Sequence, residues 1–131
     1  MLIKDNHLAL FGGETGVARA IAEAQRTAPG GTVIEVEVTG LEAALAAARA
    51  GADIILLDNM SCAAMAEVVG AIAALPAPRP ALEASGGITL ETLAEVAKTG
   101  VTRISVGALT HSALALDIAL DVEIEASTKN P

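Results

Sequence analysis

VIEVEVTGLEAALAAARAGADIILLDN, residues 33–59, is the stretch that decides the fold class. Val33–Val38 alternates apolar and acidic residues, which is typical of a strand with one buried face. Leu41–Ala50 is rich in alanine and favours a helix, and Gly51 suits the position just after a helix end. Ile54–Leu57 is a short apolar run that predicts a buried strand. A strand, a helix and a second strand joined by short loops predict a βαβ unit with parallel strands.

The same alternation continues on both sides of this unit, which predicts an α/β fold with a parallel sheet. A complete eightfold barrel needs about 250 residues, and this chain has 131. The pattern therefore leaves open a partial barrel or a doubly wound sheet. Helices are predicted at Glu14–Ala28, from a Ser61 cap to Leu75, at Leu90–Thr99 behind a Thr89 cap, and near Ala113–Leu116; further strands are predicted at Ala81–Ala84, Arg103–Val106 and Ile118–Val122.

Composition narrows the classes of function. Hydrophobic residues make up 53% of the chain and aromatic residues 1%, so the core must be built from Ala, Val, Ile and Leu. A net charge of −8 argues against nucleic acid or an anionic membrane as a partner, although a local cationic pocket could still bind a small anion. The single cysteine, Cys62, excludes an internal disulfide, and we expect it to start a helix and face the core. We find no signal peptide and no apolar run of about 20 residues, and we expect a cytoplasmic protein.

The candidate chemistry lies where the predicted strands end, because parallel α/β folds place working residues at the carboxyl ends of strands. IKDNH, residues 3–7, puts a lysine, an acid, an amide and an imidazole behind an apolar start. The candidates are Lys4, Asp5, Asn6 and His7 after the first strand, Glu35 and Glu37 on the second, Asp58 and Asn59 after the third, Glu83, Ser85, Gly86 and Gly87 at the fourth, and Gly107, Thr110, His111 and Ser112 after the fifth.

Two glycine loops in adjacent units predict phosphate binding. Ser85-Gly86-Gly87 precedes a helix that we expect to be capped at Thr89, and exposed backbone N–H groups there would attract a phosphate. Gly107 opens a second loop of the same kind. The alternative is that these glycines only make tight turns. Of the two histidines, we assign His7 a structural role and His111 a ligand role.

Glu37 and Asp58 end neighbouring predicted strands. Paired acids there could accept hydrogen bonds from ribose hydroxyls or hold Mg²⁺. Lys4 supplies a cation for a phosphate or a carboxylate. The alternative for all three is that they are ordinary solvated side chains at the rim of a sheet.

At these same residues the chain resembles the quinolinate phosphoribosyltransferase family. The matching motifs follow the family order and reach to about Leu120: IKDNH, IEVEV, GADIILLDNM, LEASGGIT and ISVGALTHSALALDIAL. The resemblance implies a partial, open TIM-like barrel of fewer than eight parallel strands, in a two-domain subunit that forms a homodimer or a higher homo-oligomer. It implies a pentosyltransferase of NAD biosynthesis that converts quinolinate and phosphoribosyl pyrophosphate, with Mg²⁺, into nicotinate mononucleotide, pyrophosphate and CO₂.

The resemblance also assigns roles to residues. Lys4 matches the lysine that faces the anionic substrates, and Glu37 and Asp58 match the acids that bind the ribose hydroxyls. These three are the implied catalytic residues. Mg²⁺ would arrive with the pyrophosphate near the two acids, without a protein-held metal site. The implied substrate-binding residues are Lys4, Glu37, Asp58, Ser85, Gly86, Gly87, Gly107 and His111.

One departure from the family pattern concerns the N-terminal domain and the first barrel strands, whose Arg-Lys and His-Arg motifs clamp the quinolinate carboxylates. This sequence does not contain them. We therefore assign residues 1–122 to the C-terminal part of the barrel and residues 123–131 to a tail. We expect weak binding of phosphoribosyl pyrophosphate or pyrophosphate and little or no turnover by the chain alone. The alternatives are a non-catalytic module that needs a complementary chain, and a molybdenum-associated pyrophosphorylase-like protein with another acceptor.

Overall fold

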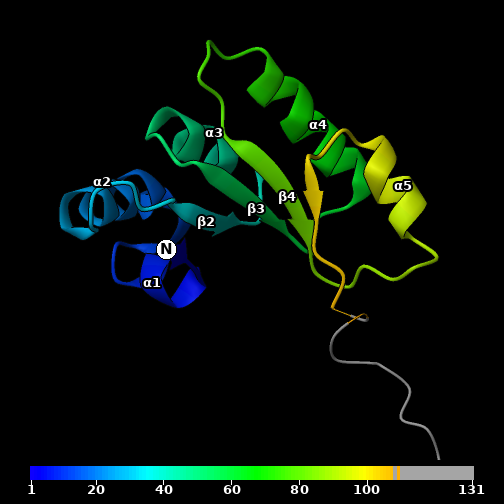
Figure 1. The fold of residues 1–131 in the computed structure, drawn as a ribbon, viewed down its shortest axis with the longest axis horizontal. Coiled ribbons are helices and arrows are strands. Elements are labelled where there is room, and N and C mark those ends of the chain that lie inside the picture. Colours follow the sequence, from blue (N-terminus) through cyan, green and yellow to red (C-terminus); the bar gives the residue numbers. More distant parts are fainter. Residues whose placement is uncertain (108, 110–131) are drawn as a thin grey trace, which may run out of the picture.

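The computed structural model describes residues 1–107 and 109, which form one parallel sheet with helices in its connections (Figure 1). The elements in chain order are β1 (Leu2–Ile3), α1 (Asp5–Ala9), η1 (Gly13–Gly16), α2 (Val17–Thr27), β2 (Glu35–Val38), α3 (Leu41–Arg49), β3 (Ile54–Asp58), α4 (Cys62–Ala73), β4 (Ala81–Ser85), α5 (Leu93–Lys98) and β5 (Arg103–Ile104).

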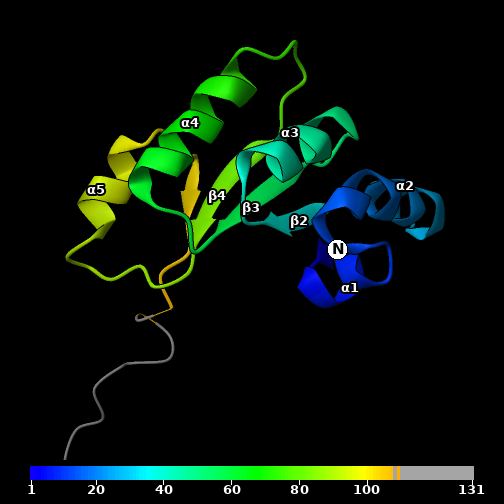
Figure 2. The ribbon, with the colours of Figure 1, turned by 180° about the vertical axis from the view of Figure 1, so that it is seen from behind.

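The order of the strands in space settles which α/β architecture this is. The five-stranded sheet runs β1-β2-β3-β4-β5, and each neighbouring pair is parallel. A doubly wound sheet reverses its strand order at a switch point, whereas a barrel adds each new strand beside the last. The described part of the chain has no reversal, so it has the topology of an open barrel segment. Figures 1 and 2 show helices α2–α5 following one another around one side of the sheet.

The two faces of the sheet differ because side chains alternate along each strand. Val36 and Val38 are buried on the helix side, in register with Ile55 and Leu57 of β3. The acids of VIEVEV therefore point to the opposite face, as the alternation predicts. Ile54 and Leu56 share that second face; both are buried, yet they stand outside the main core cluster. The second face is the one that would line the interior of a barrel.

The core behind the sheet is made of small and branched aliphatic side chains. Ala44 and Ala47 of α3 are fully buried, which lets this helix lie close to the strands. Val17 and Ile21 of α2 and Val68 of α4 are likewise fully buried. These contacts confirm the prediction of an Ala, Val, Ile and Leu core.

Two helix starts differ from the sequence prediction. The predicted helix at Glu14–Ala28 begins as the 3₁₀ turn η1, and α2 follows from Val17. Thr89 does not cap α5, whose N-cap is Thr92. The reason is a local turn in which the Thr89 N–H donates to Thr92 Oγ1 at 3.0 Å, so the chain enters the helix three residues late.

Other predictions are confirmed with small shifts. Ser61 caps α4, since its Oγ accepts a hydrogen bond from the Ala64 N–H at 3.2 Å. Cys62 starts α4 as predicted, but it is exposed rather than facing the core. The core positions of this helix fall instead on Met65, Val68 and Ile72. The predicted elements near Ala113–Leu116 and Ile118–Val122, and the tail 123–131, lie outside the described residues.

Candidate active site

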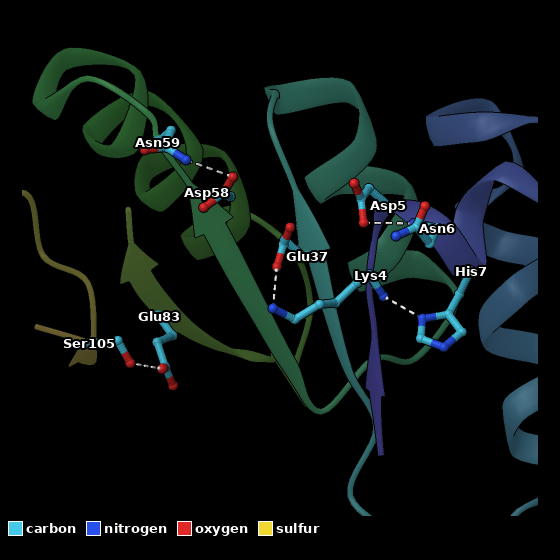
Figure 3. A network of polar contacts seen from close by, with 9 residues as sticks. All are labelled: Lys4, Asp5, Asn6, His7, Glu37, Asp58, Asn59, Glu83 and Ser105. Atoms are coloured by element: carbon cyan, nitrogen blue, oxygen red, sulfur yellow. Dashed lines mark hydrogen bonds and ion pairs between the residues drawn. The ribbon is translucent and has the colours of Figure 1, made fainter. Parts of the chain in front are cut away.

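The carboxyl ends of the strands gather the predicted site residues at one edge of the sheet. Lys4 follows β1, Glu37 lies in β2, Asp58 ends β3 and Ser85 ends β4. Asp58 and Ser85 are direct partners in the register of β3 and β4. Figure 3 shows the side chains of Lys4, Glu37 and Asp58 on successive strands. The fold thus brings together the residues that the sequence placed at four separate strand ends.

Lys4 and Glu37 form an ion pair across the first two strands. Lys4 Nζ lies 3.5 Å from Glu37 Oε2, with side-chain exposures of 53% and 17% (Figure 3). The exposed ammonium group keeps access to an incoming anion, while the carboxylate is largely shielded. The lysine side chain is long and flexible, so its ammonium group can leave the carboxylate of Glu37 and pair with a phosphate or carboxylate of a bound ligand nearby.

The backbone of Lys4 itself is hydrogen-bonded to the side chain of His7. The Lys4 N–H donates to His7 Nδ1 at 3.1 Å, which closes the first turn of α1 (Figure 3). This contact supports the structural role that the sequence analysis gave His7. The 3₁₀ turn η1 is joined to the same edge, because Glu14 Oε1 accepts from the Thr39 N–H at 2.9 Å and from Thr39 Oγ1 at 2.7 Å.

Asp58 ends β3 beside Asn59. Asn59 Nδ2 donates to Asp58 Oδ2 at 2.8 Å, so one carboxylate oxygen has a fixed partner (Figure 3). Glu37 and Asp58 lie on adjacent strands, on the same face, two residues apart in register, because Glu37 pairs with Leu56. Two carboxylates at this spacing can accept hydrogen bonds from neighbouring hydroxyls of one sugar ring.

A hollow of about 470 Å³ lies at the ends of β4 and β5, and Ser85 on its wall is the register partner of Asp58. Its size suits a phosphate-containing group, and backbone amides of a glycine loop are natural donors to such a group. Gly86 and Gly87 both have left-handed backbone, with φ of 90° and 59°. Because α5 starts only at Leu93, this loop and not a helix end borders the hollow. The lining residues are Ser85, Gly86, Gly87, Ile88, Thr89, Ser105 and Gly107.

A second cluster of polar side chains lies on the face of the sheet that carries Glu35 and Glu37. The sequence pattern did not predict that its members contact one another. Ser105 Oγ donates to Glu83 Oε1 at 2.5 Å, and Glu83 pairs in register with Arg103 (Figure 3). Burial and then the negative charge of Glu83 raise the pKa of Glu35, against the opposing effect of Arg103 and other cationic groups. Arg103 and Ser105 are two residues apart, so the alternation of side chains along a strand could have predicted that both lie on one face. His111 lies outside the described residues.

Comparison with known proteins decides the family. Residues 1–121 match the model of the family described as quinolinate phosphoribosyl transferase, C-terminal domain. The chain belongs to the quinolinate phosphoribosyltransferase family. It is 41% identical over 124 residues to the probable nicotinate-nucleotide pyrophosphorylase [carboxylating] of Bacillus subtilis, covering 95% of this chain and 40% of that protein. It is 39% identical over 120 residues to the human nicotinate-nucleotide pyrophosphorylase [carboxylating], covering 92% and 39%.

A solved structure of the family agrees with the fold. The crystal structure of NadC from Streptococcus pyogenes superposes with a TM-score of 0.77 at 42% identity, over 89% of this chain and 39% of that one. This chain thus spans about two fifths of the length of the phosphoribosyltransferase relatives it matches. Among the described helices of this family member, none is long and apolar enough to cross a membrane.

Proposed function

We propose that this chain carries the sugar- and phosphate-binding part of a quinolinate phosphoribosyltransferase site, and that its ligand is phosphoribosyl pyrophosphate. The arrangement of Glu37, Asp58 and the Ser85–Gly87 loop along one edge of the sheet carries this proposal. The two acids suit the ribose hydroxyls, and the backbone amides of the Ser85–Gly87 loop beside the hollow suit a phosphate. Family membership supplies the identity of the donor, since the relatives are named for the carboxylating pyrophosphorylase reaction.

In the complete reaction the pyridine nitrogen of quinolinate attacks the anomeric carbon of the ribose, and pyrophosphate leaves. The 2-carboxylate then departs as CO₂, its bonding electrons stay on the ring carbon, and that carbon takes up a proton. Carboxylates beside the ribose stabilise the positive charge that develops at the anomeric carbon. Glu37 and Asp58 offer carboxylate oxygens of the kind that Mg²⁺ prefers, so they would lie near an ion carried by the pyrophosphate, which would offset the charge of this leaving group.

The acceptor side of the site has few cations in the described residues. Quinolinate carries two carboxylates, whereas Lys4 is the basic residue that the structure places at the ends of β1–β4. Arg103 lies in β5, opposite Glu83. A carboxylate taken from water without a partner costs several kcal/mol. We therefore propose that the chain alone binds the donor weakly and turns over little quinolinate.

A product assay tests this function. The chain is incubated with quinolinate, phosphoribosyl pyrophosphate and Mg²⁺, and nicotinate mononucleotide is measured by chromatography. We expect donor binding in a parallel titration together with little product. Product formation at the rate of a full-length relative would contradict the limited role of this chain. Failure to bind the donor at all would contradict the proposal itself.

One observation favours a second candidate, an interaction module that pairs with a complementary chain. In the part of the chain that the structure describes, β1 has β2 as its single strand neighbour. Beside β1 lies an apolar groove of about 310 Å³ that includes Met1, Leu2 and Phe11. Met1 and Leu2 are 52% and 38% exposed, and open strand edges with apolar surroundings favour association. A monomer by light scattering over a wide concentration range would remove this candidate.

A further inference from the structure

Asn59 contacts both halves of the proposed site, although nothing in the proposed function requires it to touch a ligand. It follows β3 directly after Asp58, and its backbone has a φ of 52°. Within residues 1–107 and 109 it is the one non-glycine residue with positive φ. Asparagine tolerates this left-handed conformation better than most residues do. The chain thus turns at the end of β3 at Asn59, whose side-chain amide can also form hydrogen bonds.

The side chain of Asn59 forms a hydrogen bond with Asp58. Nδ2 of Asn59 donates to Oδ2 of Asp58 at 2.8 Å (Figure 3). The carboxylate torsion of an aspartate is broad and roughly two-fold, so a fixed donor is needed to hold its plane. A hydrogen bond to a charged acceptor is also among the stronger ones in proteins. The amide therefore selects one orientation of the acid that faces the sugar.

The other contacts of Asn59 are with the phosphate loop. Its N–H donates to the carbonyl oxygen of Ser85 at 2.9 Å. Gly86 passes so close that a Cβ at that position would collide with Asn59 Oδ1 and would lie 2.8 Å from Asn59 N. A Cβ on Gly87 would lie 4.0 Å from Asn59 Oδ1, an ordinary contact distance. The loop is thus packed against Asn59 at Gly86 in particular.

We propose that Asn59 is a positioning residue that sets the Asp58 carboxylate and the Ser85–Gly86 backbone in one frame. Sugar and phosphate are parts of the same ligand, so the distance between their two binding elements must be right for either contact to form. Glycine at this position would keep the bent backbone and lose the donor. Aspartate would keep the shape of the side chain but would replace the donor with a second negative charge. This inference rests on the proposed function.

The test compares Asn59→Gly and Asn59→Asp with the unmodified chain, using phosphoribosyl pyrophosphate with Mg²⁺ as the probe in calorimetry. We expect Asn59→Gly to weaken binding about tenfold, the usual effect of losing one hydrogen bond to a charged group. Asn59→Asp should weaken binding further, because the added charge repels Asp58. The matched control is Gln25→Ala, which removes another amide hydrogen bond, from Gln25 Nε2 to the Ala50 carbonyl at 3.1 Å, far from the site. We expect that control to leave the affinity unchanged.

A double-mutant cycle separates positioning from general stabilisation. In an Asp58→Ala background, Asn59→Gly should cause a smaller loss of affinity than in the unmodified chain, because only the contact with the Ser85–Gly86 backbone is then left to lose. Equal losses in both backgrounds, or unchanged affinity in Asn59→Gly alone, would overturn the inference and leave the proposed function standing. An unmodified chain that does not bind the probe would overturn the proposed function and this inference with it.

A measurement on the unmodified chain covers the case in which the variants fail to fold. Three-bond NMR couplings report whether Asp58 keeps the one χ1 rotamer that brings its carboxylate to Asn59 Nδ2, and hydrogen exchange reports the Asn59 side-chain amide that holds this carboxylate. We expect a single Asp58 rotamer. Asn6 and Asn59 are both exposed, and we expect the hydrogen bond to Asp58 to make the Asn59 side-chain amide exchange more slowly than that of Asn6. Averaged Asp58 rotamers together with fast Asn59 exchange would overturn the inference.

Discussion

Lys4 Nζ lies 3.5 Å from Glu37 Oε2, which joins the first strand end to the second. The lysine is 53% exposed, so the pair contributes little to folding stability, about 1 kcal/mol or less. We predict that Lys4→Met changes the free energy of unfolding by less than about 1 kcal/mol. The same change should weaken binding of phosphoribosyl pyrophosphate about tenfold, as expected for the loss of one charged contact.

Lys98→Met is the control for this change. Lys98 Nζ also pairs with an acid, Glu95 Oε1 at 2.6 Å, but on the surface of α5. We expect Lys98→Met to leave the affinity for phosphoribosyl pyrophosphate unchanged in calorimetry. Equal losses of affinity in Lys4→Met and Lys98→Met would show that only the net charge matters, and Lys4 would lose its role at the site.

Gly86 and Gly87 offer a paired test of how the phosphate loop packs. Both have left-handed backbone, so alanine costs about 1–2 kcal/mol at either position. A Cβ on Gly86 would also collide with Asn59, whereas a Cβ on Gly87 would not. We predict that Gly86→Ala lowers the free energy of unfolding by about 1–3 kcal/mol more than Gly87→Ala. Urea denaturation measures both, and equal losses would mean that the loop does not rest on Asn59.

Thr102 satisfies the backbone at the amino end of β4. Thr102 Oγ1 accepts from the Leu82 N–H at 3.0 Å and donates to the Leu82 carbonyl at 2.8 Å, in a partly buried position. The Thr102 N–H also donates to the Leu82 carbonyl, so Thr102→Val leaves the Leu82 N–H as the group that loses its partner. We predict that this change lowers the free energy of unfolding by about 1–3 kcal/mol, the cost of an unpaired donor. The control is Thr27→Val, whose hydroxyl bonds the Glu23 carbonyl at 2.8 Å on the exposed end of α2. A Thr102→Val variant as stable as Thr27→Val would contradict the prediction.

Glu35 should make stability depend on pH. Burial and the charge of Glu83 raise its pKa above the ordinary value of 4.5, so the folded chain holds this proton more tightly than the unfolded chain does. The protonated Glu35 side chain therefore stabilises the fold fully at pH values below its ordinary pKa. This contribution is lost as the pH rises through the raised pKa of the folded chain. We predict that Glu35→Gln raises the melting temperature at pH 7 relative to the unmodified chain, and has little effect near pH 4.

Glu42→Gln serves as the control for Glu35→Gln, because it removes one negative charge from an exposed site on α3. Melting temperatures of both variants are measured by circular dichroism between pH 4 and pH 8. The same gain in both variants would mean that net charge, and not the surroundings of Glu35, sets the dependence.

The sequence predicted the parts of the fold that short-range chemistry controls. Alternation in VIEVEV predicted which face carries Glu35 and Glu37, and the structure confirms it. The Ser61 cap was predictable because its Oγ needs only a backbone amide three residues on. The prediction that Thr89 caps α5 was wrong. Its local hydrogen bonds with Thr92 compete with capping, so α5 begins after Thr92.

Contacts between separate strands could not be predicted in the same way. Nothing within β5 alone shows that Ser105 reaches Glu83, because the register of β4 and β5 depends on the packing of the whole sheet. Asn59 was noted at a strand end, but its contact with Gly86 requires two loops to be placed in space. Strand order too was beyond the sequence pattern, which fitted either a barrel or a doubly wound sheet.

Calorimetric titration of phosphoribosyl pyrophosphate with Mg²⁺ into the chain tests the central claim most directly, when Glu37→Ala and Asp58→Ala are titrated in parallel. The unmodified chain should bind, and each variant should bind about tenfold or more weakly while its melting temperature stays close to that of the unmodified chain. Binding by both variants with the affinity of the unmodified chain would contradict the claim that this edge of the sheet holds the sugar.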